Sequence, residues 1–273
     1  MAIITIARGL ATLGEDVARE LAQITGYRLI DREYVEKRLG DFGIGPEKRQ
    51  KYDEKRPGFW ASLSQERDDY LHFLKTALFE EASSGECIIM GRGGSSVFKS
   101  VPSLVSVLFV APMGVRVHRI MEFYKCDERH AAQIIAQSDH DRAGFHKYFF
   151  AVDWQDPREY ELVLNTSRMD VAQAARLLDH ARRNVVDPQR EEAGRVRIAE
   201  LSLAQKVVTE IVYGKKIPIH FLEAKAQGGA ITLHGVSNTQ SSIDAAAAAA
   251  RAVGGVESVT SDIQVVQEFT VMP

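Results

Sequence analysis

The first 185 residues alternate between two patterns of hydrophobic and polar positions. Short apolar, β-branched runs predict buried strands, and longer stretches with apolar residues three and four apart predict amphipathic helices. The predicted strands cover residues 2–7, 27–30, 87–90, 104–110 and 162–164, and the predicted helices cover 17–24, most of 31–85, 113–147 and 171–185. Segments with glycine and proline at 40–46 and 56–59 interrupt the second helical region. This alternation implies right-handed crossovers and an α/β fold, in which helices cover both faces of a parallel sheet.

A polar segment at residues 184–195, which contains a proline and a glycine, predicts a linker. We therefore expect one domain at 1–190 and a second domain at 195–273. The second domain changes the order of elements to helix 198–212, strands 217–224 and 230–236, helix 243–253 and strand 256–266, which indicates a small α+β domain. The six alanines at 245–250 favour a helix packed closely on a sheet, with Ser241 as its N-cap and Gly254 and Gly255 at its end.

The composition narrows the class of protein. Hydrophobic residues make up 45% of the chain and charged residues 26%, with a net charge of −3, so there is no global reason to expect nucleic-acid binding. Cys87 and Cys126 are too few for a disulfide framework or a four-thiolate zinc site. No basic segment precedes the first apolar run, and no stretch reaches the ~18 apolar residues of a membrane span. We therefore expect a soluble, reduced, cytoplasmic protein without a transmembrane segment or a resident metal.

The segment from Gly9 to Asp16 follows the first predicted strand and opens the first helix. Its two glycines have the G-x-x-x-x-G spacing of a phosphate-binding loop (P-loop), in which backbone N–H groups and a helix N-terminus hold an anion. Lysine and serine or threonine normally follow that spacing, but Glu15 and Asp16 follow it here. Carboxylates also suit a helix N-terminus on dipole grounds. The loop alone therefore favours a capped helix over a nucleotide site.

Three other segments add to the functional interpretation. Residues 30–33 end the second strand and residues 88–98 end the third, at the edge where ligands bind in open α/β sheets. Arg92 lies in the second of these segments, where an arginine has few structural roles and can clamp a phosphate. Residues 137–150 concentrate charged side chains and predict either a solvated helix face or a mobile lid. Arg116 and Arg119 lie on one helix face, where they could pair with Glu122 or point towards that lid.

Together these segments resemble the cytidylate kinase-like family of P-loop nucleoside monophosphate kinases over roughly residues 1–185. Residues 7–18 follow S-R-x-[YF]-G-S-G-G-R-E-I-A, with Ala11 and Leu13 in place of two glycines and Glu15 in place of the basic residue. The other matching segments are LIDRE at 29–33, GRGGSSVF at 91–98, the D-x-x-R pair at 139 and 142 followed by Tyr148 and Phe149, and YELVLNTSRM at 160–169.

The resemblance implies a kinase that transfers a phosphoryl group from ATP with Mg²⁺ to CMP or a related nucleoside monophosphate. It assigns the residues of the site as follows: Arg8, Gly9, Thr12 and Gly14 to the donor phosphates, Asp31 and Arg92 to the acceptor, and Arg142, oriented by Asp139, to the group in transfer. Two unit charges about 4 Å apart interact by about 4 kcal/mol at an effective dielectric near 20, so Glu15 predicts weak ATP binding and weak activity. Replacing Leu13 by glycine and Glu15 by arginine is then expected to strengthen ATP binding. Asp16 could hold the magnesium ion. The alternatives are an inactive nucleotide sensor and an adaptor whose first domain is only a scaffold.

The second domain resembles a BON module. ITLHGVSN at 231–238 and VGGVESVTSDIQVV at 253–266 match its strand, glycine turn and final strand, with Gly235, Gly255 and Val265 at the matching positions. The resemblance implies binding of phospholipid or other hydrophobic ligands. Docking of a protein partner or self-association is an equal alternative.

Overall fold

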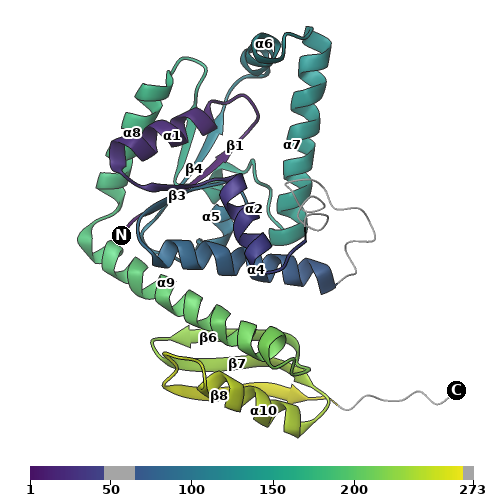
Figure 1. Cartoon of the computed structure of the whole chain (residues 1–273). Helices are drawn as coiled ribbons and strands as arrows, with labels where there is room; N and C mark the ends of the chain where they lie inside the picture. The colour runs from purple at the N-terminus through teal and green to yellow at the C-terminus, as the bar shows by residue number, and fades with distance from the viewer. Residues whose placement is uncertain (46–64, 267–273) are drawn as a thin grey trace, which may run out of the picture. The chain divides into compact units, whose positions relative to one another are not determined.

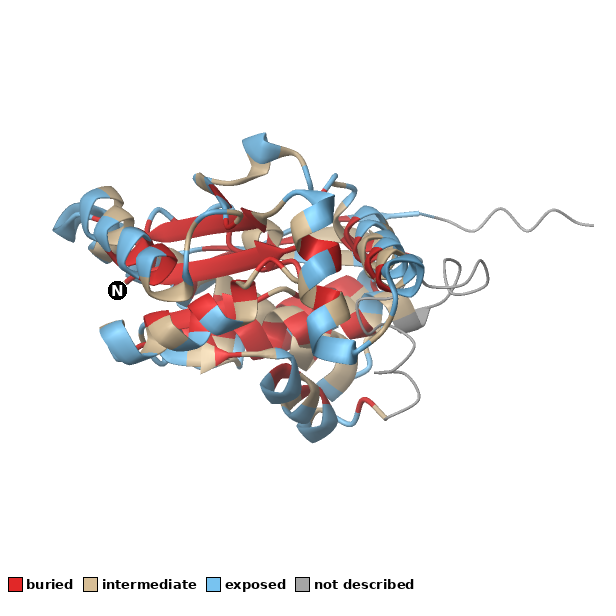
Figure 2. Cartoon of the chain, turned by 90° about the horizontal axis from the view of Figure 1, so that it is seen from above, coloured by how far each residue is buried: buried red, intermediate tan, exposed pale blue. Residues whose placement is uncertain are grey.

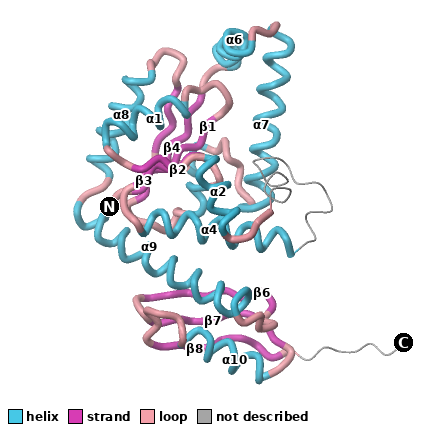
Figure 3. Tube along the Cα trace, viewed as in Figure 1, coloured by secondary structure: helices cyan, strands magenta, loops and turns pink. Residues whose placement is uncertain are grey.

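The computed structural model describes residues 1–45 and 65–266. The chain forms two compact units, Met1–Gly194 and Arg195–Pro273, and each is described by itself. Figures 1 and 3 show the helices and strands of both units.

The first unit is built on a five-stranded parallel sheet with the order β2-β3-β1-β4-β5. Its strands are β1 (Ile3–Arg8), β2 (Arg28–Ile30), β3 (Cys87–Met90), β4 (Leu104–Val110) and β5 (Leu162–Asn165). Each neighbouring pair is parallel, as in Ile6↔Met90 between β1 and β3 and Arg8↔Phe109 between β1 and β4. The carboxyl ends of all five strands therefore meet at one edge of the sheet.

Helices cover both faces of this sheet (Figure 1). They are α1 (Gly14–Thr25), α2 (Arg32–Asp41), α4 (Gln65–Ser83), α5 (Gly94–Val97), α6 (Met113–Tyr124), α7 (Glu128–Phe150) and α8 (Val171–Val185), with a 3₁₀ turn at Pro157–Glu159. The α/β fold predicted from the sequence is confirmed. The predicted helix 113–147 is two helices, because Lys125 takes a left-handed conformation and Asp127 caps α7 by accepting the amide N–H of His130 at 2.7 Å. The predicted break at 56–59 lies outside the described residues.

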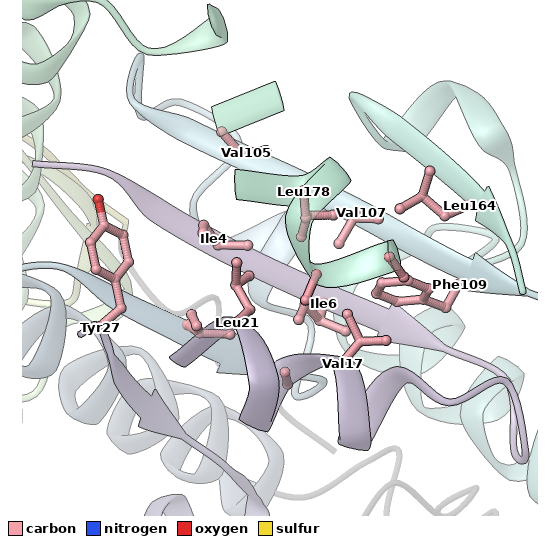
Figure 4. Packing of buried hydrophobic residues seen from close by; sticks show 14 of the residues in the cluster. Ile4, Ile6, Val17, Leu21, Tyr27, Val105, Val107, Phe109, Leu164 and Leu178 are labelled. Atoms are coloured by element: carbon pink, nitrogen blue, oxygen red, sulfur yellow. The ribbon is translucent and has the colours of Figure 1, made fainter. Parts of the chain in front are cut away.

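The main core lies between the sheet and the pair α1 and α8. Alternate residues of β1, Ile4 and Ile6, face Val17 and Leu21 of α1 and Leu178 of α8 (Figure 4). These side chains are at most 1% exposed, and Figure 2 shows the strands as buried elements between helices whose outer turns are exposed. Burial of one such side chain contributes about 1.5–3 kcal/mol to the stability of the fold. Because β1 and α1 pack on each other in this core, the core fixes the positions of the end of β1 and the start of α1.

The predicted linker at 184–195 is mostly helical. Helix α9 (Pro188–Val208) begins there because Asp187 accepts the amide N–H of Arg190 at 2.7 Å and proline suits the first helical position. The polar composition that indicated a linker belongs to an exposed helix face.

The second unit is a three-stranded sheet with helices. Strands β6 (His220–Gln227) and β7 (Ala230–Ser237) are antiparallel, and β7 and β8 (Ser258–Val265) are parallel, joined by α10 (Gln240–Arg251). Its alanine-rich helix buries Ala246 and Ala250 in the core of the unit, as the sequence predicts, but the N-cap is Thr239 rather than Ser241. A π-helical turn at Thr209–Gly214 follows α9. No described helix is long and apolar enough to cross a membrane.

Candidate functional site

The predicted site residues follow three strands of the first unit. Arg8 ends β1, Asp31 follows β2 and Arg92 follows β3, and these strands are neighbours in the order β2-β3-β1. Because the strands are parallel, the three residues lie at the same edge of the sheet, where open α/β proteins bind ligands. Arg142 and Asp139 lie on α7.

The loop between β1 and α1, residues 9–13, keeps the backbone of a glycine-rich loop without most of its glycines. Ala11 has φ 61° and Leu13 has φ 63°, so both residues adopt the left-handed conformation, which costs a residue with a side chain about 1–2 kcal/mol. These are the positions at which the family pattern has glycine. No side chain caps the N-terminus of α1, where Leu13 is the N-cap residue.

Contacts within the loop explain the two glycines that remain. A Cβ at Gly14 would lie 2.8 Å from the Cβ of Arg8, and a Cβ at Gly9 would lie 3.2 Å from the Arg116 guanidinium. The buried hydroxyl of Thr12 donates to the carbonyl of Gly9 at 2.8 Å, so this predicted phosphate contact serves the loop itself.

Glu15 forms an ion pair with Arg8. The Nε of Arg8 lies 2.8 Å from the Oε1 of Glu15, and the Arg8 side chain is 10% exposed while that of Glu15 is 42% exposed. The negative charge that predicts repulsion of a triphosphate is therefore largely neutralised from within the loop. The neighbouring carboxylate of Asp16 pairs with Arg19 at 2.7 Å at the surface.

Two arginines of α6 hold this loop from outside. Arg116 donates from Nε to the carbonyl of Leu10 at 2.7 Å, and Arg119 donates to the carbonyl of Ala11 at 2.9 Å and to that of Thr166 at 2.7 Å. Leu10 and Ala11 also pack on an apolar cluster between α6 and α7. From the sequence, these two arginines were expected to pair with Glu122 or to point towards the lid, and not to hold this loop. Their three-residue spacing on one helix face was the only available signal.

The structure corrects the predicted pairing on α7. Asp139 does not orient Arg142 but binds Arg116 in a bidentate ion pair, with both N–O distances at 2.8 Å. Arg142 is 9% exposed and hydrogen bonds to Ser138 one turn earlier on the helix. Asp139 therefore links α7 to α6 and, through Arg116, to the β1–α1 loop.

The two predicted acceptor residues carry structural contacts. Asp31 is the N-cap of α2 and accepts the amide N–H of Tyr34 at 2.9 Å. Arg92 has φ 54° and is 1% exposed, and its guanidinium contacts the hydroxyl of Tyr70 at 3.2 Å and the carboxylate of Glu36 at 3.1 Å. The expectation that Arg92 has few structural roles is wrong, because α2 and α4 bury it.

The last turn of α7 packs on the same loop. A Cβ at Gly93 would lie 2.0 Å from the Phe150 ring, and Gly93 has φ 68°. Glycine at position 93 therefore favours the left-handed backbone and leaves room for the end of α7.

Burial perturbs two other titratable groups of the first unit, His72 and Cys87. Burial lowers the pKa of His72 on α4 to about 4, with a smaller contribution from Lys75. Burial raises the pKa of the Cys87 thiol to about 12, at the opposite end of β3 from Arg92. The described residues, 1–45 and 65–266, contain no group of three or more His, Cys, Asp or Glu that could hold a metal ion.

Comparisons with known proteins agree with this architecture. Residues 3–168 match the model of the cytidylate kinase-like family, and residues 200–267 match that of the BON domain. A search of curated proteins found no match.

One solved structure shows the same fold over about two thirds of the chain. An uncharacterized protein from Eubacterium ventriosum is 19% identical, with a TM-score of 0.55, covering 67% of this chain and 99% of that chain. A shikimate kinase from Bacteroides thetaiotaomicron is 11% identical (TM-score 0.40, 67% and 98% covered), and a gluconokinase from Sinorhizobium meliloti is 16% identical (TM-score 0.40, 67% and 95% covered). The family model covers more than half of the chain, and the loops that carry its motifs lie together at one sheet edge, so the chain belongs to the cytidylate kinase-like family.

Proposed function

We propose that the first unit binds ATP and a nucleoside monophosphate, CMP or a close relative, and transfers the phosphoryl group between them slowly. The left-handed backbone at Ala11 and Leu13 carries this proposal, because the loop keeps an unfavourable conformation that a simple helix cap does not need. Strained residues of this kind concentrate at ligand sites.

In phosphoryl transfer the protein mainly positions the two reactants and neutralises charge on the oxygens of the group in transfer. The N-terminus of α1 and the β1–α1 loop would hold the donor phosphates. Arg142 would stabilise the group in transfer from the lid helix, and Asp31 and Arg92 would line the acceptor side.

A magnesium ion fits this site only as a partner of the nucleotide. Magnesium in such sites takes one or two carboxylates plus substrate phosphates, and Asp16, with its half-exposed carboxylate in the first turn of α1, is the residue that would hold it. When bound, the ion neutralises charge on the donor phosphates.

Weak turnover follows from two contacts. Glu15 occupies the basic position of the family pattern and already neutralises Arg8. Asp139 is paired with Arg116 and does not orient Arg142. We therefore expect CMP to bind more tightly than ATP and turnover to fall well below the ~1–100 per second of ordinary kinases.

Calorimetric titration of the full chain with CMP and with ATP plus Mg²⁺, followed by a coupled ADP-release assay, tests this proposal. Arg142→Gln should lower turnover at least about 100-fold, and Arg176→Gln, which changes an exposed arginine of α8, should leave it unchanged. Failure of both nucleotides to bind at millimolar concentration would refute nucleotide binding, and turnover above 1 per second would refute the weak kinase.

The second candidate function is a nucleotide sensor that signals through the BON domain. The face of its sheet opposite the core favours a polar partner, because Glu223, His234 and Asp262 lie in one cross-strand row and Lys225 and Thr232 lie in the next. Binding of nucleotide without turnover would support this function. Flotation of the full chain with phospholipid vesicles tests the lipid alternative, and an oligomeric state that changes with nucleotide tests self-association.

A further inference from the structure

Every carbonyl of the β1–α1 loop is already hydrogen bonded. The five acceptors are consecutive, and their donors come from the loop, from α6, from the turn after β5 and from α1. The pairs are Gly9 O with Thr12 Oγ1 (2.8 Å), Leu10 O with Arg116 Nε (2.7 Å), Ala11 O with Arg119 (2.9 Å), Thr12 O with Thr166 Oγ1 (3.0 Å) and Leu13 O with Val17 N (2.9 Å).

This arrangement directs the amide groups of the loop to the opposite side. In a trans peptide the carbonyl of one residue and the N–H of the next point in opposite directions. The bonds to Leu10 O, Ala11 O and Thr12 O therefore turn away the N–H groups of Ala11, Thr12 and Leu13. These N–H groups donate to no acceptor within residues 1–45 and 65–266. The loop, with left-handed residues at positions 11 and 13, therefore directs three consecutive N–H groups away from its bonded carbonyls, and such a row of backbone donors suits an anion.

Arg119 differs from the other arginines around the loop in its charge balance. Arg8 pairs with Glu15, Arg19 with Asp16 and Arg116 with Asp139. Arg119 contacts only carbonyl and hydroxyl oxygens and has no carboxylate partner within the described part of the chain. Its positive charge is therefore not neutralised by a carboxylate, while the usual basic position of the loop holds Glu15.

Thr166 couples Arg119 to the loop. Its buried hydroxyl donates to the carbonyl of Thr12 and accepts from Arg119 at 3.2 Å, and Arg119 also holds the carbonyl of Thr166. One hydroxyl thus orients both the loop and the cation beside it.

We propose that Arg119 and Thr166 are positioning residues for the donor phosphates. They hold the carbonyls of Ala11 and Thr12 so that the following amides face the phosphates on the opposite side, and the positive charge of Arg119 behind the loop favours an anion in front of it. This inference rests on the proposed function, because it takes the loop as the donor-phosphate site. It adds an explanation of how the loop keeps its backbone conformation with alanine and leucine at two glycine positions of the family pattern.

The matched pair Thr166→Val and Thr166→Ser separates the hydroxyl from the shape of the side chain. We expect Thr166→Val to weaken ATP binding about tenfold and Thr166→Ser to restore it, with CMP affinity unchanged in both. Arg119→Gln should weaken ATP binding at least about tenfold, and Arg119→Lys should recover part of the loss because it keeps the charge. Arg176→Gln is the control. Calorimetric titration with ATP and CMP gives the affinities, and thermal melting reports the fold.

The outcomes distinguish this inference from the proposed function. Wild-type ATP affinity in a folded Thr166→Val and a folded Arg119→Gln would overturn the inference and leave the proposed function standing. If Thr166→Val does not fold, the Arg119 pair decides alone.

A second measurement uses inorganic tripolyphosphate and the amide ¹H–¹⁵N shifts of Ala11, Thr12 and Leu13. Shifts at these amides without ATP binding would support the inference and refute ATP as the donor. If neither the amide shifts nor ATP binding is observed, both this inference and the proposed function are overturned.

Discussion

Two loops leave the same edge of the parallel sheet, one after β1 and one after β3. Arg8 ends β1 just before Gly9 of the first loop, and Arg92 lies between two glycines in the second. In the β1–α1 loop, alanine and leucine stand at positions 11 and 13, where the family pattern has glycine, but both residues keep the left-handed backbone. In the loop after β3 the sequence GRGG follows the pattern, but its arginine is buried between α2 and α4.

The difference shows that the residues of a motif do not by themselves fix its role. The first loop keeps its backbone conformation although its residues differ, and the second keeps its residues although its arginine has structural contacts. The backbone of the first loop is held by side chains that lie about 100–155 positions away in the chain, in α6 and after β5, so it tolerates alanine and leucine at glycine positions. Arg92 in the second loop contacts Glu36 and Tyr70. These contacts favour an arginine at this position even when no ligand is bound. We therefore expect substitution of Arg92 to lower the stability of the fold and substitution of Ala11 by glycine to raise it.

The largest effect is expected from Arg92→Met, which removes a buried cation from its partners. Loss of one member of a buried ion pair costs 3–5 kcal/mol, and because Glu36 is 32% exposed we expect a loss of about 2–4 kcal/mol in the free energy of unfolding. Tyr70→Phe, which removes one hydroxyl, should cost about 1 kcal/mol. Urea denaturation measures both. A stability within 0.5 kcal/mol of wild type, on the scale of a surface substitution, would show that Arg92 is available for ligand without a structural cost.

The next effect is a pH dependence of stability caused by the buried His72 of α4. The pKa of His72 is about 4 in the folded chain and about 6.5 when unfolded, so the unfolded state binds the additional proton between these values. Stability is therefore unaffected above pH 6.5 and falls by about 1.4 kcal/mol per pH unit as the pH drops, for a total of about 3 kcal/mol near pH 4. His72→Leu should remove this part of the slope. Equal slopes for the two proteins between pH 6.5 and 4.5 would refute the assignment.

The fold could be predicted from the sequence because it depends on local periodicity. The contacts of the candidate site could be predicted only in part. The strand and helix patterns of 2–24 and 171–185 give the sheet and its cover, since one face of each element is apolar. The contacts of Arg116 with Asp139, and of Arg119 with Thr166, join residues 23 and 47 positions apart on different elements. Nothing in a hydrophobic pattern encodes which carboxylate an arginine meets, so Asp139 was assigned to Arg142 through the resemblance to the family's D-x-x-R motif.

A smaller effect is expected from Glu15→Gln on the donor side. A full Coulomb repulsion of about 4 kcal/mol predicted from the sequence does not apply, because Arg8 pairs with Glu15 and the carboxylate is 42% exposed. Removing the charge releases the Arg8 guanidinium and should strengthen ATP binding by less than about tenfold, with stability changed by less than about 1 kcal/mol. Glu15→Arg would instead place a cation against Arg8, so the single neutral change is the sharper test. Glu122→Gln, which removes an exposed carboxylate of α6, is the control for general charge effects, and calorimetric titration with ATP gives the comparison.

The smallest expected effect, and the most direct test of the comparison, comes from Ala11→Gly. Glycine removes the cost of the left-handed backbone, about 1–2 kcal/mol, but adds conformational entropy to the unfolded chain worth about 0.4–1 kcal/mol. We therefore expect stabilisation of about 0.5–1 kcal/mol, measured by urea denaturation, with ATP affinity within twofold of wild type because the carbonyl bond to Arg119 remains. Leu13→Gly is the matched variant: it relieves the same strain but loses the packing of Leu13 on the core, so it should be no more stable than wild type. A large gain in ATP affinity from Ala11→Gly would mean that alanine distorts the loop. The donor side would then have lost its backbone geometry along with its glycines, and the contrast between the two loops would fail.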